Sequence, residues 1–314
     1  MPSLGLPILP RSRPGGTKVF KLASSPSTLP KLLAAVKAHK LGIAAAVQSA
    51  IILVTRELAP PALANQDYST IAYFSHREYL PKPYSDPAAW PMGLWMLGLP
   101  LSQPEADFAT TARNMQALYG QDLTVDKSPM FEWYHGFSAR MAQLFGSPMS
   151  DNVPPPTQPQ LSSIGLVDGR VKTRYEGKVI VDVETVEPIV DMMVPQIAIY
   201  QWYEYFGFFP ALIFPPLAST QPIFLNAEGY PLEAHMIINN PPPPSFLKHV
   251  SLRTNSDTNR NLKFGRSFKG IWYMNACYNE SNYSEVYVEE FLKRVKATLF
   301  QNLEISEQAQ LYHK

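Results

Sequence analysis

The side chains best suited to chemistry in this sequence are its histidines, because imidazole takes up and releases a proton near neutral pH. The chain has six of them, at positions 39, 76, 135, 235, 249 and 313. Its single cysteine, Cys277, is a possible nucleophile, but it lies in an apolar stretch without a histidine beside it. We therefore interpret Cys277 as inert packing. One cysteine excludes an internal disulfide and indicates a reducing compartment, so we expect a cytoplasmic protein.

Searches for other chemical motifs find little in the sequence. There is no glycine-rich phosphate loop, no Gly-x-Ser-x-Gly segment and no paired spacing of metal ligands. We therefore predict no metal and no tightly bound cofactor. The 27 basic residues balance 26 acidic ones, and the pair Lys18 and Lys21 is too small to form a basic patch. A nucleic-acid partner is therefore not expected.

The composition is that of a globular protein, with 46% hydrophobic and 17% charged residues among 314. This length is enough for one large domain or two small ones. The apolar run 41–55 is shorter than the roughly 20 residues of a membrane span. A second uncharged run, 205–227, contains four prolines that would break a helix. We therefore expect no membrane insertion.

The elements that must position any site alternate between helix and strand patterns, which predicts an α/β protein. The clearest helix covers 43–58, where Ile43, Val47 and Ile51 fall on one face. A strand at 270–278 followed by a helix at 284–303 forms the clearest pair, with acidic residues early and basic residues late in the helix. Further helices are predicted at 31–39, 105–119 and 130–145, and further strands at 68–74, 92–99, 161–167, 178–186 and 195–203.

Three segments do not follow this pattern. We expect residues 1–16 to form a flexible lead-in, and the proline-rich residues 147–160 to form a linker. A proline-rich loop or insertion at about 208–269 is far longer than ordinary loops in compact domains. The strands on its two sides would join as a short hairpin. We therefore hypothesise that these residues are a translated intron, which sequencing of the transcript would test.

Four segments, in this order, resemble fungal CoA-dependent acyltransferases of the condensation-domain-like and alcohol or trichothecene O-acetyltransferase group. Residues 32–58 resemble the opening of the second lobe of that group. Residues 75–81 resemble its Asp-x-Arg-x-Tyr-Leu-Pro segment, although Ser75 stands where the acid is usual. Residues 161–168 resemble its Ser-Ser-Leu-Gly strand. Residues 276–295 resemble its last strand and helix.

The resemblance implies an α/β fold made of a single chloramphenicol-acetyltransferase-like lobe, a mixed sheet with flanking helices, over residues 17–314. In the family, two such lobes enclose a tunnel, and a His-x-x-x-Asp motif in the first lobe supplies the base. No histidine here has an aspartate four residues later, and His235 has Asn239 at that spacing. We infer that the N-terminal lobe, and with it the catalytic histidine, is absent from this chain.

The resemblance also suggests site residues in the lobe that is present. Ser162 and Ser163 are candidates to stabilise an oxyanion, since relatives use second-lobe hydroxyls near the site. The alternative is that they are strand residues satisfied by their neighbours. Arg77 is a candidate CoA contact or a structural ion-pair partner. An aromatic run could line an acceptor tunnel or pack in the core; it comprises Tyr200, Trp202, Tyr203, Tyr205 and Phe206.

The leading interpretation is an acyltransferase-family protein of fungal secondary metabolism that moves an acyl group from acyl-CoA, its cosubstrate, to the hydroxyl of a small acceptor. The chain would then be a fragment, the partner of a complementary N-terminal lobe, or an inactive remnant. Alternatives are a non-catalytic accessory protein of a biosynthetic gene cluster and a repurposed cyclase or dehydratase. A lone lobe exposes the apolar face that meets its partner, so we also expect self-association.

Overall fold

The computed structural model describes thirteen stretches of the chain, and all structural statements below concern these residues. They are residues 3–9, 15–25, 27–75, 77–86, 89, 96–123, 136, 139–140, 156–166, 174–175 with 178–179, 197–203 and 271–306.

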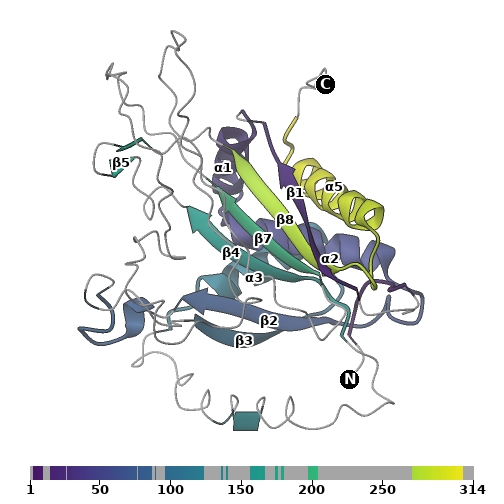
Figure 1. The fold of residues 1–314 in the computed structure, drawn as a ribbon, viewed down its shortest axis with the longest axis horizontal. Coiled ribbons are helices and arrows are strands. Elements are labelled where there is room, and N and C mark those ends of the chain that lie inside the picture. The colour runs from purple at the N-terminus through teal and green to yellow at the C-terminus, as the bar shows by residue number, and fades with distance from the viewer. Residues whose placement is uncertain are drawn as a thin grey trace.

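The centre of the fold is a four-stranded mixed sheet with the order β1-β8-β7-β4 (Figure 1). Strand β1 spans Thr17–Ala23, β8 spans Trp272–Asn279, β7 spans Ala198–Tyr203 and β4 spans Gln160–Leu166. Strand β8 is antiparallel to both of its neighbours, whereas β4 runs parallel to β7. The first and last strands described along the chain, β1 and β8, thus lie side by side in one sheet.

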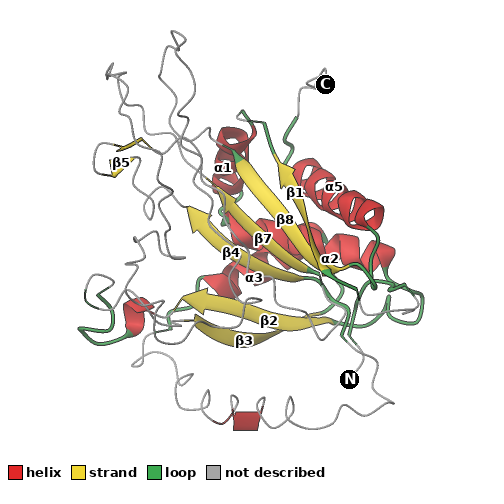
Figure 2. Cartoon of the chain, viewed as in Figure 1, coloured by secondary structure: helices red, strands yellow, loops and turns green. Residues whose placement is uncertain are grey.

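Helices cover one face of this sheet (Figure 2). Helix α1 spans Thr28–Ala38, α2 spans Ile43–Leu58 and α5 spans Glu285–Asn302. Helix α5 begins after Ser284, whose side chain accepts a hydrogen bond from the Tyr287 backbone N–H at 3.2 Å. This cap satisfies one of the orphan donors at the start of the helix.

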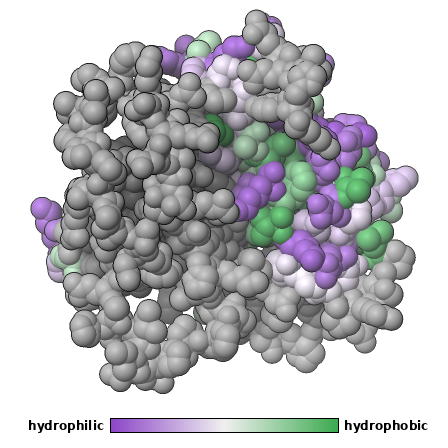
Figure 3. Space-filling model, turned by 45° about the horizontal axis from the view of Figure 1, so that its top comes forward, coloured by the Kyte–Doolittle hydropathy of each residue, from purple (hydrophilic) through white to green (hydrophobic). Residues whose placement is uncertain are grey.

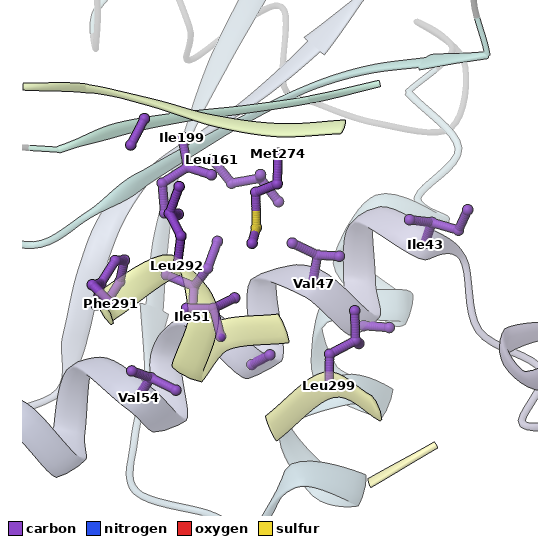
Figure 4. Close-up of a cluster of buried hydrophobic side chains, with 14 of the residues drawn as sticks. Ile43, Val47, Ile51, Val54, Leu161, Ile199, Met274, Phe291, Leu292 and Leu299 are labelled. Carbon is purple, nitrogen blue, oxygen red and sulfur yellow. The ribbon is translucent and has the colours of Figure 1, made fainter. Parts of the chain in front are cut away.

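Apolar residues at helical spacing on α2 and α5 meet the inward-facing residues of the strands (Figure 4). Ile51 and Phe291 are each 0% exposed, as is Met274 on β8. Burial of this kind removes apolar surface from water and is the main stabilising contribution to folding. Helix α3, Phe108–Tyr119, packs against α2 and contributes Phe108 and Ala112 to the same core.

A separate two-stranded antiparallel sheet, formed by β2 (Tyr68–Ser75) and β3 (Met96–Gln103), lies beside β4. The Tyr73 hydroxyl donates a hydrogen bond to Gln160 Oε1 on β4 at 3.4 Å. A 3₁₀ helix, η1, follows β2 and spans Arg77–Tyr79. Two short strands, β5 (Arg174–Tyr175) and β6 (Lys178–Val179), pair with each other.

Most predicted elements are confirmed, and helix 43–58 has the predicted bounds. The strand predicted at 92–99 instead runs from Met96 to Gln103, past Pro100. Pro100 is tolerated because β3 has one partner strand among the described residues, and an outer strand can hold a residue without an N–H. Helix α3 starts at Phe108, three residues later than predicted, because the Asp107 side chain caps it by accepting from the Thr110 N–H at 2.7 Å. The helix predicted at 130–145, the strand after residue 179 and the insertion at 208–269 lie mainly or wholly outside the described residues.

The N-terminal segment, residues 3–9, differs from the predicted flexible lead-in. Leu4 is 0% and Leu6 1% exposed, so both are core residues. Backbone N–H groups of this segment donate to Asp67 O, Thr157 O and Asn282 O, from Leu4, Leu6 and Leu9 respectively. The segment therefore joins three parts of the chain that are distant in sequence, and these tertiary bonds keep it against the fold.

On the part of the surface that Figure 3 colours, hydrophilic and hydrophobic residues are interspersed. Large side chains exposed among the described residues include Leu9 and Val286. No single helix in the described ranges has the length and apolar character of a membrane span. The pair α1 and α2 passes that test only when taken together, across a 92° bend.

Candidate functional site

The candidate site lies on the parallel strands β4 and β7, because β4 carries both predicted serines at its third and fourth positions. The residues that lead into β4 are held by a buried contact, in which the Tyr68 hydroxyl donates to Pro159 O. Gln48 on α2 donates from Nε2 to the same hydroxyl at 3.1 Å. Burial raises the pKa of Tyr68, so its hydroxyl stays protonated and able to donate. The start of β4 is thereby fixed to α2 and β2.

Ser162 and Ser163 point to opposite faces of the sheet, since consecutive residues of a strand alternate. Leu161 and Ile199 are paired across β4 and β7 and belong to the helix-packed core. Ser163, two residues after Leu161, is therefore on the helix side, and Ser162 is on the other side. The two candidate hydroxyls therefore face different sides of the sheet, and the role of either in contacting an oxyanion stays a prediction.

Ser163 is exposed, and its Oγ accepts a hydrogen bond from Gln201 Nε2 at 2.9 Å. Gln201 is the residue opposite Ser163 on β7 and is 0% exposed. Its Oε1 accepts from Trp272 Nε1 on β8 at 3.4 Å, and Trp272 is 1% exposed. Three adjacent strands thus contribute to one chain of hydrogen bonds that ends at an exposed hydroxyl.

Ser162 is half-buried and belongs to a row of polar residues on the opposite face. The strand register places Tyr200, Asn275 and Lys21 beside it, in that order, on β7, β8 and β1. Asn275 is 1% exposed, whereas Lys21 is exposed at the outer strand. This row contains hydroxyl, phenol, amide and amine groups, all of which can donate hydrogen bonds.

The other residues suggested by the sequence are placed apart from these serines. Arg77 is half-buried at the start of the 3₁₀ helix after β2, and its role as a CoA contact stays a prediction. Cys277 is 3% exposed on β8, between Val19 and Ala198 in the register, which fits the packing interpretation. His39 is exposed at the C-terminal end of α1.

The remaining histidines lie outside the described residues, as do Tyr205 and Phe206 and the side chains of Trp202 and Tyr203. Tyr200 is half-buried, and its place in an acceptor tunnel stays a prediction. Within the described ranges, no group of three or more side chains is suited to hold a metal ion.

The sequence reasoning did not identify Gln201 or Trp272 as site residues. A signal was present, because Gln201 is a polar residue at a position where alternation with Ile199 predicts an apolar, core-facing side chain. A polar residue at such a position must find a hydrogen-bond partner. The sequence does not reveal that the partner on one side is an exposed serine.

Comparison by sequence finds no matching protein-family profile and no matching curated protein. Comparison by structure does find matches. The trichothecene 15-O-acetyltransferase from Fusarium sporotrichioides matches with a TM-score of 0.58 and 12% identity over 97% of this chain and 50% of that one. The epimerization domain from the third module of tyrocidine synthetase B matches with a TM-score of 0.51 and 10% identity, over 95% and 51% of the two chains.

These matches show the class of fold: a single chloramphenicol-acetyltransferase-like lobe, with a mixed four-stranded sheet and flanking helices. The predicted fold class is thereby confirmed. The chain spans about half the length of the solved structures it matches. That it corresponds to the second lobe of such a pair stays a prediction from the resemblance.

Proposed function

We propose that this chain is one lobe of an acyl-CoA-dependent O-acyltransferase that acts on a hydroxyl of a small secondary metabolite. The observation that carries the proposal is the match of 97% of the chain to half of a trichothecene 15-O-acetyltransferase. In the proposed reaction the acceptor oxygen attacks the thioester carbonyl carbon, a C–O bond forms and the C–S bond breaks. The acceptor proton passes through a base to the departing thiolate of CoA.

The base in this proposal comes from outside the chain. The sequence has no His-x-x-x-Asp motif, and imidazole is the group best matched to this proton transfer at neutral pH. A complementary lobe, encoded in frame upstream or on another chain, would supply it. This lobe therefore binds acyl-CoA and the acceptor but does not complete the transfer alone.

The test has two readouts on the purified chain. Isothermal titration calorimetry with acetyl-CoA measures binding, and release of CoA thiol in the presence of a 15-hydroxytrichothecene measures transfer. We expect binding without ester formation, and ester formation once a lobe carrying His-x-x-x-Asp is joined to the chain. Ester formation by the chain alone would contradict the need for a second lobe. Failure to bind acetyl-CoA would overturn the acyl-CoA proposal.

A second function, a non-catalytic accessory protein, is favoured by the same missing motif. In this case the lobe binds a small acceptor-like molecule and never acyl-CoA. Calorimetry with each ligand in turn distinguishes the two functions, because both kinds of protein would bind the 15-hydroxytrichothecene but the accessory protein would not bind acetyl-CoA.

A further inference from the structure

The N-terminal residues 3–6, which we call the strap, are held by parts of the chain that are far from them in sequence. The Leu4 N–H donates to Asp67 O at 2.9 Å, and the Leu6 N–H donates to Thr157 O at 3.2 Å. Asp67 directly precedes β2, and Thr157 lies three residues before β4. We call the residues that the strap contacts the strap site. The strap thus joins the start of β2 to the residues that lead into β4.

The first and third positions of the strap are each matched to one type of residue. Ser3 Oγ accepts a hydrogen bond from the Ser69 N–H at 3.0 Å and donates one to Asp67 O at 3.2 Å. At Gly5, an added Cβ would overlap Thr157 Oγ1 and lie 3.2 Å from the Thr157 carbonyl carbon. A hydroxyl is therefore favoured at the first position. Glycine fits at the third position, where any larger residue requires the chain to shift.

Leucines occupy the second and fourth positions of the strap. Leu4 is 0% exposed and belongs to a cluster that includes Tyr68 and Met115. Leu6 is 1% exposed and belongs to the main core. Their burial is opposed by the entropy cost of fixing the backbone of the strap, so the net free energy that holds the strap is much smaller than the stability of the whole fold. A segment held in this way opens locally, before the rest of the protein unfolds.

Strand β4 is the element that depends most on the strap. It is an outer strand of the described four-stranded sheet, where it is bonded to β7. Just before β4, the Leu6 N–H holds Thr157 O, and the Tyr68 hydroxyl holds Pro159 O. Leu4 is buried in the same cluster as Tyr68, so the strap supports both of these contacts.

We propose that the strap site is a binding site for an extended Ser-Leu-Gly-Leu peptide, filled in this structure by the chain's own residues 3–6, and that its occupation holds β4 in place. When the strap leaves, the strand that carries Ser162 and Ser163 loosens while the helix-packed core stays folded. The strap is therefore a device that controls one strand of the candidate site.

The experiment uses the whole chain and a labelled peptide with the sequence of residues 3–9. In the double variant Leu4→Asn, Leu6→Asn the chain's own strap is released, because a polar side chain at these buried positions costs free energy. We expect the peptide to bind this variant, as measured by fluorescence anisotropy. It should bind the wild type at least about 100-fold more weakly, because there the chain's own strap competes at a high effective concentration.

Altered peptides test the match at each position. Gly5→Ala in the peptide should weaken binding by about tenfold or more, as at other overpacked sites. Thr157→Ala in the chain should recover part of this loss. Ser3→Ala in the peptide should weaken binding by about threefold to tenfold, the effect of one neutral hydrogen bond. The matched control is Ile8→Ala in the peptide, which should leave binding unchanged because Ile8 is 37% exposed.

Hydrogen exchange measures the effect of the strap on β4. The Gln160 N–H donates to Ile197 O at 2.8 Å. In the released variant this amide should exchange about tenfold faster or more, and saturating peptide should slow it again. Amides in the middle of α5 should keep their protection throughout.

Each outcome supports or overturns one part of the proposal. A folded released variant that does not bind the peptide, or that binds the Gly5→Ala peptide equally well, overturns the strap site. Unchanged exchange at Gln160 in that variant overturns the control of β4. If the released variant loses α5 protection as well, Gly5→Ala in the chain replaces it, because this substitution keeps both leucines. Joint loss of β4 and α5 protection in this second variant overturns the proposal, since the strap is then an inseparable part of the core. Strap binding does not involve acyl-CoA, so its failure leaves the proposed function unaffected.

Discussion

The helix-packed face of the four-stranded sheet and the first part of the N-terminal segment 3–9 both bury apolar side chains almost completely, although Leu9 near the end of the segment is exposed. Phe291 and Leu4 are both 0% exposed, and Leu6 is 1% exposed. On α5 the burial follows from helical periodicity, and the helix satisfies its own backbone. In the N-terminal segment, backbone bonds to Asp67, Thr157 and Asn282 replace regular structure. The periodicity of apolar residues therefore predicts burial only in an element, such as α5, whose backbone hydrogen bonds lie within the element itself.

The largest expected effect is at the regular core, in Phe291→Ala. Phe291 lies among residues of α2, α5 and the sheet, so its removal leaves a cavity as well as lost apolar burial. We expect unfolding free energy, measured by urea denaturation followed by circular dichroism, to fall by about 3–5 kcal/mol. Val286→Ala on the same helix is the control, because Val286 is 75% exposed and should change stability by less than about 0.5 kcal/mol. Equal effects of the two substitutions would show that α5 does not pack as described.

A second large effect on stability is expected from replacing residues 205–270, which tests whether β7 and β8 pair without them. Tyr203 lies opposite Trp272, as in a hairpin. The backbone groups of Trp272 bond to Ser24, on the β1 side. Tyr203 and Trp272 are therefore a pair without backbone bonds to each other, and in a shortened chain the residues one step closer to the turn would form the bonded pair. A type I′ Asn-Gly turn in place of residues 205–270 would close this pair.

This shortened chain should fold to the same sheet and be more stable. Each halving of a flexible loop lowers its closure cost by about 0.6 kcal/mol, so the replacement is worth roughly 3 kcal/mol at most. Urea midpoints report the stability, and hydrogen exchange at β8 amides reports the pairing. Loss of β8 protection in the shortened chain would show that the replaced residues are needed for the sheet.

The sequence predicted the elements that carry their own periodicity. Helices α2 and α5 were placed correctly because their apolar residues recur about every 3.6 residues, and Ser284 marks the start of α5. Strand β8 was placed beside α5 from its apolar, strand-forming residues. The N-terminal segment was missed because Leu4 and Leu6 are too few to show a period. The strand that became β3 was predicted to end before Pro100, because a proline usually ends a strand. The sequence does not show that β3 is an outer strand, where a proline is tolerated.

The candidate site was predicted less completely than the fold. Ser162 and Ser163 were identified together, but alternation along β4 separates them onto opposite faces. Alternation alone gives this separation, but only the packed structure shows that Ser163 is on the face covered by the helices. The contact between Gln201 and Trp272 joins residues far apart in sequence, so no local pattern indicates it.

A smaller effect is expected from Gly5→Ala in the N-terminal segment. A Cβ on Gly5 would overlap Thr157 Oγ1 and lie 3.2 Å from the Thr157 carbonyl carbon. The segment would have to move away, which strains the bond from Leu6 N–H to Thr157 O. We expect a loss of about 1–3 kcal/mol in unfolding free energy, as for other overpacked sites.

Gly136→Ala is the matched control, since a Cβ there meets nothing within 4 Å. It should be neutral or slightly stabilising. Thr157→Ala removes the overlapping Oγ1, so the double variant Gly5→Ala, Thr157→Ala should recover part of the loss. Additive losses in this double-mutant cycle would mean that the two residues do not meet, and that the N-terminal segment is less firmly placed than the core.

The smallest effect on stability is expected at Asp107, which caps α3 through a hydrogen bond within the same helix. Hydrogen bonds from the backbone and side chain of Thr110 lower the pKa of Asp107 below its ordinary value of 3.8, with a further contribution from Arg113. A carboxyl whose folded pKa is lowered stabilises the fold above the unfolded pKa and loses that effect as pH falls through the folded pKa. Asp107→Asn keeps an acceptor oxygen but does not titrate. The wild type should therefore exceed Asp107→Asn in urea midpoint at about pH 6, and this advantage should be lost as the pH falls through the lowered pKa of Asp107. A difference that stays constant with pH would show that the charge on Asp107 does not contribute, and that the cap acts through its oxygen alone.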